Sequence, residues 1–117
     1  MTGHRDWASI KTALNGIRAH DDENYIAARS RDYFWYSPIL NEQLKDKLGE
    51  LVVVPQTVEE VMHVASVVAR HKVPLTLRGG GTGNYGQCVP LEGGIIMDLT
   101  RLDKVIEITD GHVRVEA

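Results

Sequence analysis

The sequence predicts an α/β fold in which a helical leader is followed by a strand–helix–strand unit and further strands. The first observation is the apolar, β-branched run at residues 51–54, typical of a strand buried on both faces. The second is a helical pattern that follows a capping signal at Thr57. The third is a set of short apolar runs after that helix. The 117 residues are enough for about one small domain.

Residues 1–50 form the predicted leader, which is helical or irregular. Apolar residues recur at helical spacing and predict an amphipathic helix from about Asp6 to Ala19; they are Trp7, Ile10, Leu14 and Ile17. A polar break covers residues 20–24, and the aromatic cluster 33–36 is expected to pack in a core or an interface. Pro38 should stop any preceding helix, and a short helix is expected at 41–48 before Gly49.

Residues 51–117 form the second predicted part. Thr57 and Glu60 have the spacing of a capping box and begin a helix that extends to about His71. Its expected buried face consists of Val58, Val61, Met62, Ala65, Val68 and Ala69. The next strand is 75–77, so the strand–helix–strand order predicts parallel strands with a right-handed crossover.

Three more strands are expected after residue 90, at 95–99, 105–108 and 112–116. The last two flank Thr109-Asp110-Gly111, which is typical of a hairpin turn.

A glycine-rich loop follows the strand at 75–77, with five glycines within the eight residues 79–86. Glycine tolerates positive φ and leaves the backbone N–H groups accessible. Successive N–H groups that face one way bind anions, so the loop predicts a site for a phosphate or pyrophosphate, with Arg78 beside it.

Residues 81–86 also fit the G-x-G-x-x-G spacing of a dinucleotide-binding Rossmann fold. That fold needs a helix directly after the loop, and Pro90 and the Gly93-Gly94 pair oppose one. A P-loop would need a closing Gly-Lys-Ser/Thr, which the run lacks. A plain turn without a ligand would need only one or two glycines.

Composition excludes several function classes. The net charge of −3 gives no indication of nucleic-acid binding. No apolar stretch approaches the ~20 residues of a membrane span, and the N-terminus has no apolar signal core. The single cysteine, Cys88, fits a reducing cytoplasm, which is the expected location.

No residue is predicted to be catalytic or to bind a metal. The five histidines show no ligand spacing, and His63 and His71 are expected to be surface or satisfied residues. Cys88 is expected to be a small, half-buried residue, and Asp98 a turn or cap acceptor.

The segments 54–61, 77–83 and 93–102, in this order, resemble the FAD-binding domain of the vanillyl-alcohol oxidase / p-cresol methylhydroxylase superfamily (PCMH type). Arg31-Asp32 resembles the leader of its glycolate-oxidase-like and D-lactate-dehydrogenase-like members, and the Gly-Thr-Gly form of the loop favours that branch. The resemblance implies that residues 51–117 are the first subdomain of this domain, with 1–50 as its leader.

The resemblance implies a role for each loop residue. The FAD pyrophosphate would lie against the loop, with Pro55 near the adenosine end. The expected cofactor-binding residues are Pro55, Arg78, Gly79, Gly80, Gly81, Thr82, Gly83, Asn84 and Gly86. Arg78 would neutralise phosphate charge or pair with a surface carboxylate. Covalent-flavin members carry a histidine where this chain has Gly81, so FAD is expected to be non-covalent.

Family members continue beyond the position of Ala117, so we expect the chain to be an incomplete, truncated FAD domain that is inactive alone and prone to self-associate. Its parent protein would be an FAD-linked oxidoreductase that acts on a small 2-hydroxy acid. The alternative is a non-catalytic module that binds a phosphate-bearing ligand, a nucleotide or a partner subunit.

Overall fold

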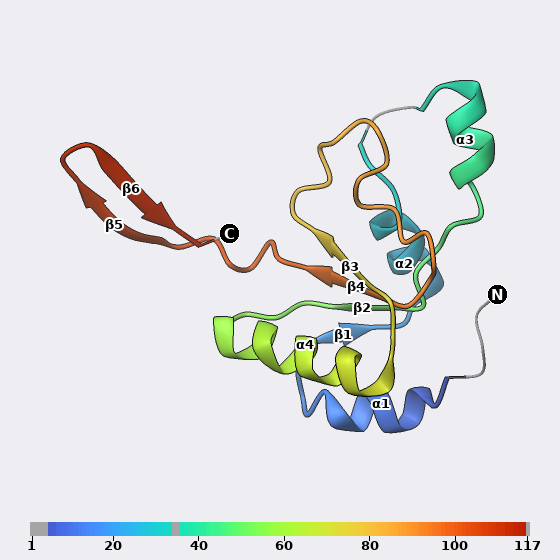
Figure 1. The fold of residues 1–117 in the computed structure, drawn as a ribbon, viewed down its shortest axis with the longest axis horizontal. Coiled ribbons are helices and arrows are strands. Elements are labelled where there is room, and N and C mark those ends of the chain that lie inside the picture. Colours follow the sequence, from blue (N-terminus) through green and yellow to red (C-terminus); the bar gives the residue numbers. More distant parts are fainter. Residues whose placement is uncertain (1–4, 34–35, 117) are drawn as a thin grey trace.

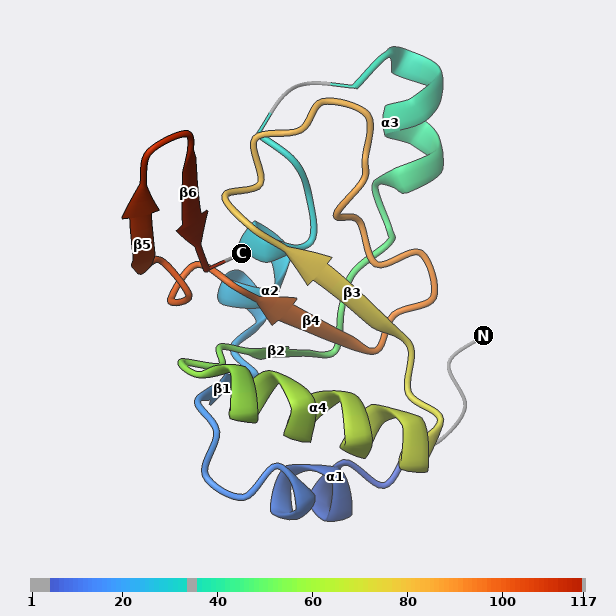
Figure 2. The same cartoon turned by 60° about the vertical axis from the view of Figure 1, so that its left-hand side comes forward.

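A computed structural model describes residues 5–33 and 36–116 of the chain. The elements form a four-stranded sheet with helices on both faces and a separate hairpin (Figures 1 and 2). The helices are α1 (Trp7–Ala13), α2 (Glu23–Arg29), α3 (Pro38–Leu44) and α4 (Val58–His71). The strands are β1 (Ala19–His20), β2 (Leu51–Val53), β3 (Leu75–Arg78), β4 (Ile95–Asp98), β5 (Val105–Thr109) and β6 (His112–Val115).

The main sheet has the order β1-β2-β4-β3. Strands β2 and β3 are both parallel to β4, which lies between them. The prediction of parallel strands joined by a helix is therefore confirmed, although the two strands are not neighbours. Strand β1 pairs with β2 in the antiparallel direction, so the leader contributes to the same sheet.

Alternate residues of β2 and β4 serve two separate cores, as the period-2 geometry of strands requires. Leu51 and Val53 face α1 and α4 together with Ile95 and Met97. On the other face, Val52, Val54 and Ile96 pack with Ile26 of α2. Strands β2 and β4 are thus a buried middle layer between α2 on one face and α1 and α4 on the other (Figure 2), whereas β3 is only partly buried.

Helix α4 begins as predicted, because the Thr57 hydroxyl accepts a hydrogen bond from the N–H of Glu60 at 3.1 Å. The prediction of its buried face is only partly right. Val64, Val67 and Val68 are buried and Val61 is half-buried, whereas Val58 and Met62 are exposed to 55% and 66%. Ala65 and Ala69 are also exposed. Apolar residues of α4 also occur outside the face that packs on the sheet. The sequence pattern alone therefore could not show which of them are buried.

The leader differs most from the prediction. Helix α1 ends at Ala13 rather than near residue 19, because Asn15 and Gly16 adopt positive φ values of 51° and 83°. Helix α2 was not predicted; the Asp22 side chain caps it by accepting from the N–H of Tyr25 at 2.9 Å. Helix α3 begins three residues before the predicted helix, with Ser37 as its N-cap and Pro38 in its first turn.

The hairpin β5–β6 projects away from the rest of the chain (Figure 1). Its turn at Asp110-Gly111 was predicted, and Gly111 has a φ of 95°. The pairs Ile108–Val113 and Val105–Val115 share one face, and these four side chains are 56–74% exposed. The pairs Glu107–Arg114 and Thr109–His112 form the opposite, polar face.

Candidate functional site

The glycine loop begins at the carboxyl edge of the main sheet. Register places Arg78 beside Asp98, and the Leu99 N–H donates to the Arg78 carbonyl oxygen at 2.8 Å. Because β2, β3 and β4 are parallel, Pro55, Gly79 and Leu99 all follow strand ends at this edge. Open α/β sheets bind ligands in the crevice outside the carboxyl ends of their strands.

The first half of the loop presents free donors. In the described part of the chain, the backbone N–H groups of residues 79–84 donate to no protein acceptor. Gly79, Gly80, Thr82 and Asn84 are exposed, so these N–H groups and the two polar side chains are accessible. Buried backbone donors require partners, whereas exposed successive N–H groups suit an anion with several oxygens. These residues therefore fit a pyrophosphate.

The space around Gly79 and Gly80 is open, as a site for an anion requires, whereas Arg78 packs closely against Gly81. A Cβ atom at Gly79 would meet nothing within 4 Å, and one at Gly80 would approach only Thr82 Cγ2, at 3.7 Å. Gly81 is different: its φ is 69°, and a Cβ there would lie 2.0 Å from Nη2 of Arg78. A side chain at position 81 would therefore require Arg78 to move.

The second half of the loop is anchored to the protein. The N–H of Gly86 donates to Oδ2 of Asp32 at 2.6 Å, and the N–H of Tyr85 donates to Oε1 of Gln87 at 3.2 Å. Gly86 has a φ of 84°, and a Cβ there would lie 2.9 Å from Cδ1 of Leu44. In this conformation the N–H of Gly86 is engaged by the leader, and the cofactor contact predicted for Gly86 stays a prediction.

Arg78 points toward the leader. Its Nη1 donates to the carbonyl oxygen of Arg31 at 2.7 Å and of Arg29 at 3.3 Å. The same nitrogen lies 3.3 Å from the Cys88 sulfur. The suggested pairing with a surface carboxylate is not found for Arg78 in the described residues. The guanidinium is held by backbone carbonyls instead.

Asp32 contacts the end of the glycine loop, and the sequence did not single it out as part of the site. Its side chain accepts from Gly86 through Oδ2 and from the Cys88 thiol through Oδ1, both at 2.6 Å. Asp32 is 7% exposed. Its contacts lie 54 and 56 residues away along the chain, so no local spacing could have revealed them. The only signal was the Arg31-Asp32 pair within the leader resemblance.

Cys88 is buried at 8% exposure, more than the half-burial expected. Burial, together with the hydrogen bond and negative charge of Asp32, raises the pKa of the Cys88 thiol to about 11. The thiol therefore stays protonated near neutral pH and donates to Asp32.

Pro55 and Asp98 complete the carboxyl edge. Pro55 is fully buried, so its predicted contact with adenosine stays a prediction that this conformation does not provide. Asp98 is the turn acceptor that was expected: Oδ1 accepts from the N–H and hydroxyl of Thr100 at 2.9 and 2.6 Å. Its Oδ2 pairs with Nε of Arg29 at 3.4 Å.

A hollow of about 220 Å³ lies at the same edge, and three arginines line it. Its lining consists of Arg18, Tyr25, Arg29, Val54, Asp98, Thr100 and Arg101. The lining has three arginines and one carboxylate, Asp98, so the hollow adds net positive charge at this edge beyond the glycine loop.

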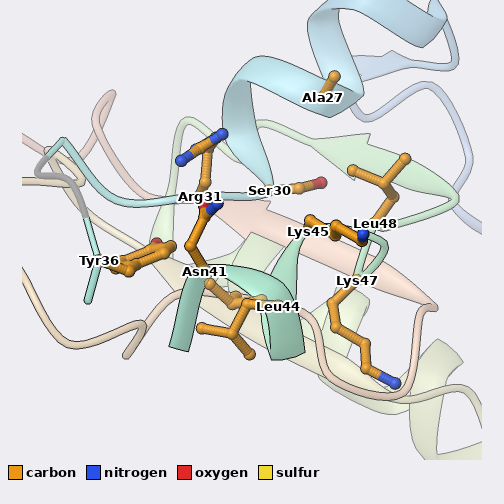
Figure 3. A pocket seen from close by; sticks show the side chains of 10 residues that line it. Ala27, Ser30, Arg31, Tyr36, Asn41, Leu44, Lys45, Lys47 and Leu48 are labelled. Atoms are coloured by element: carbon orange, nitrogen blue, oxygen red, sulfur yellow. The ribbon is translucent and has the colours of Figure 1, made fainter. Parts of the chain in front are cut away.

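A smaller cavity of about 20 Å³ lies between α2, α3 and the chain segments that follow these two helices (Figure 3). Arg31, Tyr36 and Leu44 are among the side chains around it. Its volume is that of about one water molecule, too small for a cofactor. Of the predicted aromatic cluster here, Phe34 and Trp35 lie outside the described residues. Tyr33 is 76% exposed, and the Tyr36 hydroxyl accepts from the N–H of Asp32 at 2.8 Å.

The histidines of the described residues form no ligand cluster. His63 is satisfied as expected, because its Nε2 donates to the Ala13 carbonyl oxygen at 2.6 Å and joins α4 to α1. Across residues 5–33 and 36–116, no group of three or more metal-ligating side chains comes together. In those same ranges, no helix has the length and apolar content that crossing a membrane requires.

Comparison with known proteins gives the family. Residues 49–117 match the family described as "FAD binding domain". The chain is 38% identical over 58 residues to glycolate oxidase subunit GlcD of Escherichia coli K12, covering 50% of this chain and 12% of that protein. It is 34% identical over 67 residues to an uncharacterized oxidoreductase of Rhodococcoides fascians, covering 57% of this chain and 15% of the relative. The chain thus spans about an eighth of the length of these relatives.

Solved structures show the same fold. An alkyldihydroxyacetonephosphate synthase superposes with a TM-score of 0.73 at 18% identity, over 93% of this chain and 23% of that one. The 4-ethylphenol oxidase of Gulosibacter chungangensis gives 0.68 at 20% identity, over 89% of this chain and 20% of the other. p-Cresol methylhydroxylase gives 0.64 at 17% identity, over 92% and 21%. The family match covers more than half of the chain, which therefore belongs to the FAD-binding domain family of FAD-linked oxidoreductases, with FAD as its cofactor.

Proposed function

We propose that residues 79–84 bind the pyrophosphate of FAD and that FAD is held without a covalent bond. The observation that carries this proposal is the row of accessible backbone N–H groups that find no acceptor within residues 5–33 and 36–116. Each N–H can donate to a phosphate oxygen, and the Thr82 hydroxyl and Asn84 amide can add side-chain hydrogen bonds.

Non-covalent binding is supported by Gly81. A linking side chain at this position would start from a Cβ atom 2.0 Å from the Arg78 guanidinium. Cys88 could offer a nucleophilic sulfur, but its thiol is buried and donates to Asp32. Neither residue suits a bond to flavin in this conformation.

The protein's part in the chemistry is to hold and orient the cofactor. FAD, when bound, supplies the hydride acceptor of the reaction. Residues 79–84 would fix its phosphates at the carboxyl edge, and the rigid β3–β4 pair would fix the position of the loop. None of the described residues needs to move a proton for this role.

We further propose that the protein to which this chain contributes oxidises a small 2-hydroxy acid. Support comes from the names of its relatives: glycolate oxidase subunit GlcD, E. coli D-2-hydroxyglutarate dehydrogenase at 41% identity over 76 residues, and probable D-lactate dehydrogenase of Danio rerio at 32% over 59 residues. Each name specifies a 2-hydroxy acid. Anaerobic bleaching of the flavin in the product of the complete reading frame, by glycolate, D-lactate or D-2-hydroxyglutarate, tests this substrate class.

The cofactor proposal is tested by titrating the chain with FAD and following flavin fluorescence. We expect saturable binding and full release of unmodified FAD on denaturation. Thr82→Ala and Asn84→Ala should each weaken binding about 10–100-fold, the loss of one hydrogen bond to a charged group. Thr109→Ala, in the distant hairpin, is the matched control. Binding unaffected by both loop changes, or flavin that stays on the denatured chain, would contradict the proposal.

A subunit-interaction role is favoured by one observation, the exposed apolar face of the hairpin. Val105, Ile108, Val113 and Val115 form this face. Burying such a face against a second copy would stabilise association at about 25 cal/mol per Å² of apolar surface. Self-association of the chain through this face of the hairpin is therefore a second proposal.

A further inference from the structure

The leader and the glycine loop are joined at both ends of the predicted pyrophosphate site. At one end, Arg78 donates to the carbonyl oxygens of Arg29 and Arg31. In the middle, the N–H of Tyr33 donates to the carbonyl oxygen of Gly81 at 2.7 Å. These bonds and those that Asp32 accepts from Gly86 and Cys88 together form the leader–loop contact.

At the other end of the loop, Asp32 accepts from the N–H of Gly86 and from the thiol of Cys88. The buried carboxylate thus satisfies one donor at the loop end and one just after it. Between these anchors lie residues 79–84, whose N–H groups donate to no acceptor among the described residues. The leader therefore bonds to the carbonyl of Gly81 and to the N–H of Gly86, and leaves the N–H groups of residues 79–84 for a ligand.

The direction of Arg78 is the decisive detail. An arginine beside a phosphate loop is the obvious phosphate ligand, because its planar fork matches phosphate oxygens. Here Nη1 is occupied by leader carbonyls, and Nη2 lies where a Cβ of residue 81 would be. The guanidinium thus packs against the backbone of the loop instead of extending toward a phosphate.

We propose that Arg78 and Asp32 are positioning residues that hold the glycine loop in its pyrophosphate-binding conformation, and that Arg78 acts on the cofactor through the loop rather than by contact with phosphate. This inference rests on the proposed role of residues 79–84. It adds that the leader is part of the cofactor site, although residues 29–33 contribute no predicted ligand contact.

Asp32→Asn gives a test in which charge and geometry predict opposite signs. Removing a negative charge near an anion site should, by Coulomb's law alone, tighten FAD binding. A carboxylate, however, offers two acceptors to Gly86 and Cys88, whereas the asparagine side chain offers one oxygen acceptor and an NH₂ donor. One of the two bonds is lost, so the positioning role predicts FAD binding weaker by about tenfold.

Arg78→Lys keeps the positive charge but ends one bond short of Nη1, so the contact with Arg31 is lost. If the charge acts directly on phosphate, most FAD affinity should remain. If Arg78 acts through the loop, affinity should fall about tenfold, and the double variant with Asp32→Asn should lose far less than the ~100-fold product because both changes release the same loop. Asp110→Asn and Arg114→Lys are the matched charge controls in the hairpin.

Amide hydrogen exchange measures the same contact without FAD. Each variant should speed exchange of the Gly86 amide and shift backbone resonances in both 29–33 and 79–86, while the far-UV circular dichroism of the chain and the amide resonances of α4 are unchanged. Tighter or unchanged FAD binding in Asp32→Asn, or resonance changes confined to the substituted segment, would overturn the positioning role. If the wild-type chain binds no FAD, the proposed function fails, and the exchange data still decide whether the two residues hold the loop.

Discussion

The carboxylate of Asp32 accepts a hydrogen bond from the backbone N–H of Gly86 at 2.6 Å, across 54 positions of the sequence. Asp32 belongs to the leader and Gly86 to the loop proposed to bind FAD phosphate. Together with the bond from the Tyr85 N–H to Gln87, this bond engages the two loop donors that follow residues 79–84. It makes the leader a structural part of the site.

Gly81→Ala should damage both the fold and FAD binding. The new methyl group would collide with Arg78, and the residue must keep a φ of 69°. Gly16→Ala is the matched control, since Gly16 has a φ of 83° and open space around it. We expect a loss of about 1 kcal/mol in unfolding free energy for Gly16→Ala and a clearly larger loss for Gly81→Ala, measured by urea denaturation. Equal losses would show that Arg78 yields without cost.

Asp98→Ala should destabilise the chain by about 2–4 kcal/mol. The Asp98 side chain is only 4% exposed and pairs with Arg29, and it also accepts two hydrogen bonds from Thr100. Removing this carboxylate leaves the Thr100 N–H and the Nε of Arg29 without their acceptor. Asp110→Ala, in the exposed hairpin turn, should change the free energy of unfolding by less than about 0.5 kcal/mol. Similar urea midpoints for both variants would contradict this account of the carboxyl edge.

Stability should fall in alkaline solution partly through Cys88. The pKa of its thiol is raised from 9.0 to about 11 by burial and by Asp32, so the folded state favours the protonated form. This contribution is fully present below pH 9 and is lost as pH rises through about 11. Cys88→Ala should flatten the pH dependence of the unfolding free energy in this interval. An unchanged slope would mean that the thiol titrates normally.

Alkylation of Cys88 gives an independent check on the same thiol. At pH 8 we expect iodoacetamide to react far more slowly with the folded chain than with the urea-unfolded chain, because the thiolate is the nucleophile. Asp32→Asn should speed the reaction, since it removes the negative charge that raises the thiol pKa.

Self-association should depend on the apolar face of the hairpin. Light scattering during size-exclusion chromatography should show a mass that increases with concentration, and Ile108→Lys or Val113→Lys should reduce it to that of the monomer. Thr109→Lys places the same charge on the opposite, polar face and serves as the control. An equal effect from all three variants would indicate a general charge effect instead of an interface.

Much of the sheet could be predicted because its signals are local. Residues 51–53 form a strand as their β-branched run indicates, and Thr57 caps α4 through a bond three residues away. The turn at Asp110-Gly111 could be predicted because the turn requires a positive φ, which Gly111 adopts readily. Each of these features depends on residues close together in sequence.

The rest depends on contacts between distant segments. Strand β1 has two residues and exists through its pairing with β2, while α2 has seven residues and packs Ile26 against the sheet. The glycine loop could be located from sequence, but the engagement of Arg78 by the leader could not. Asp32 approaches Gly86 only after the sheet and α2 have brought residues 29–33 to the carboxyl edge.

The proposed cofactor site requires that residues 79–84 present their N–H groups to the pyrophosphate of FAD. The most direct measurement is a ¹⁵N–¹H NMR titration of the chain with FAD, repeated with ADP and inorganic pyrophosphate. We predict that the amides of residues 79–84 shift with all three, while those of Gly86, held by Asp32, and of the hairpin shift least. Saturable FAD binding with unchanged amide shifts at residues 79–84 and the largest shifts elsewhere would show that the pyrophosphate binds at another place.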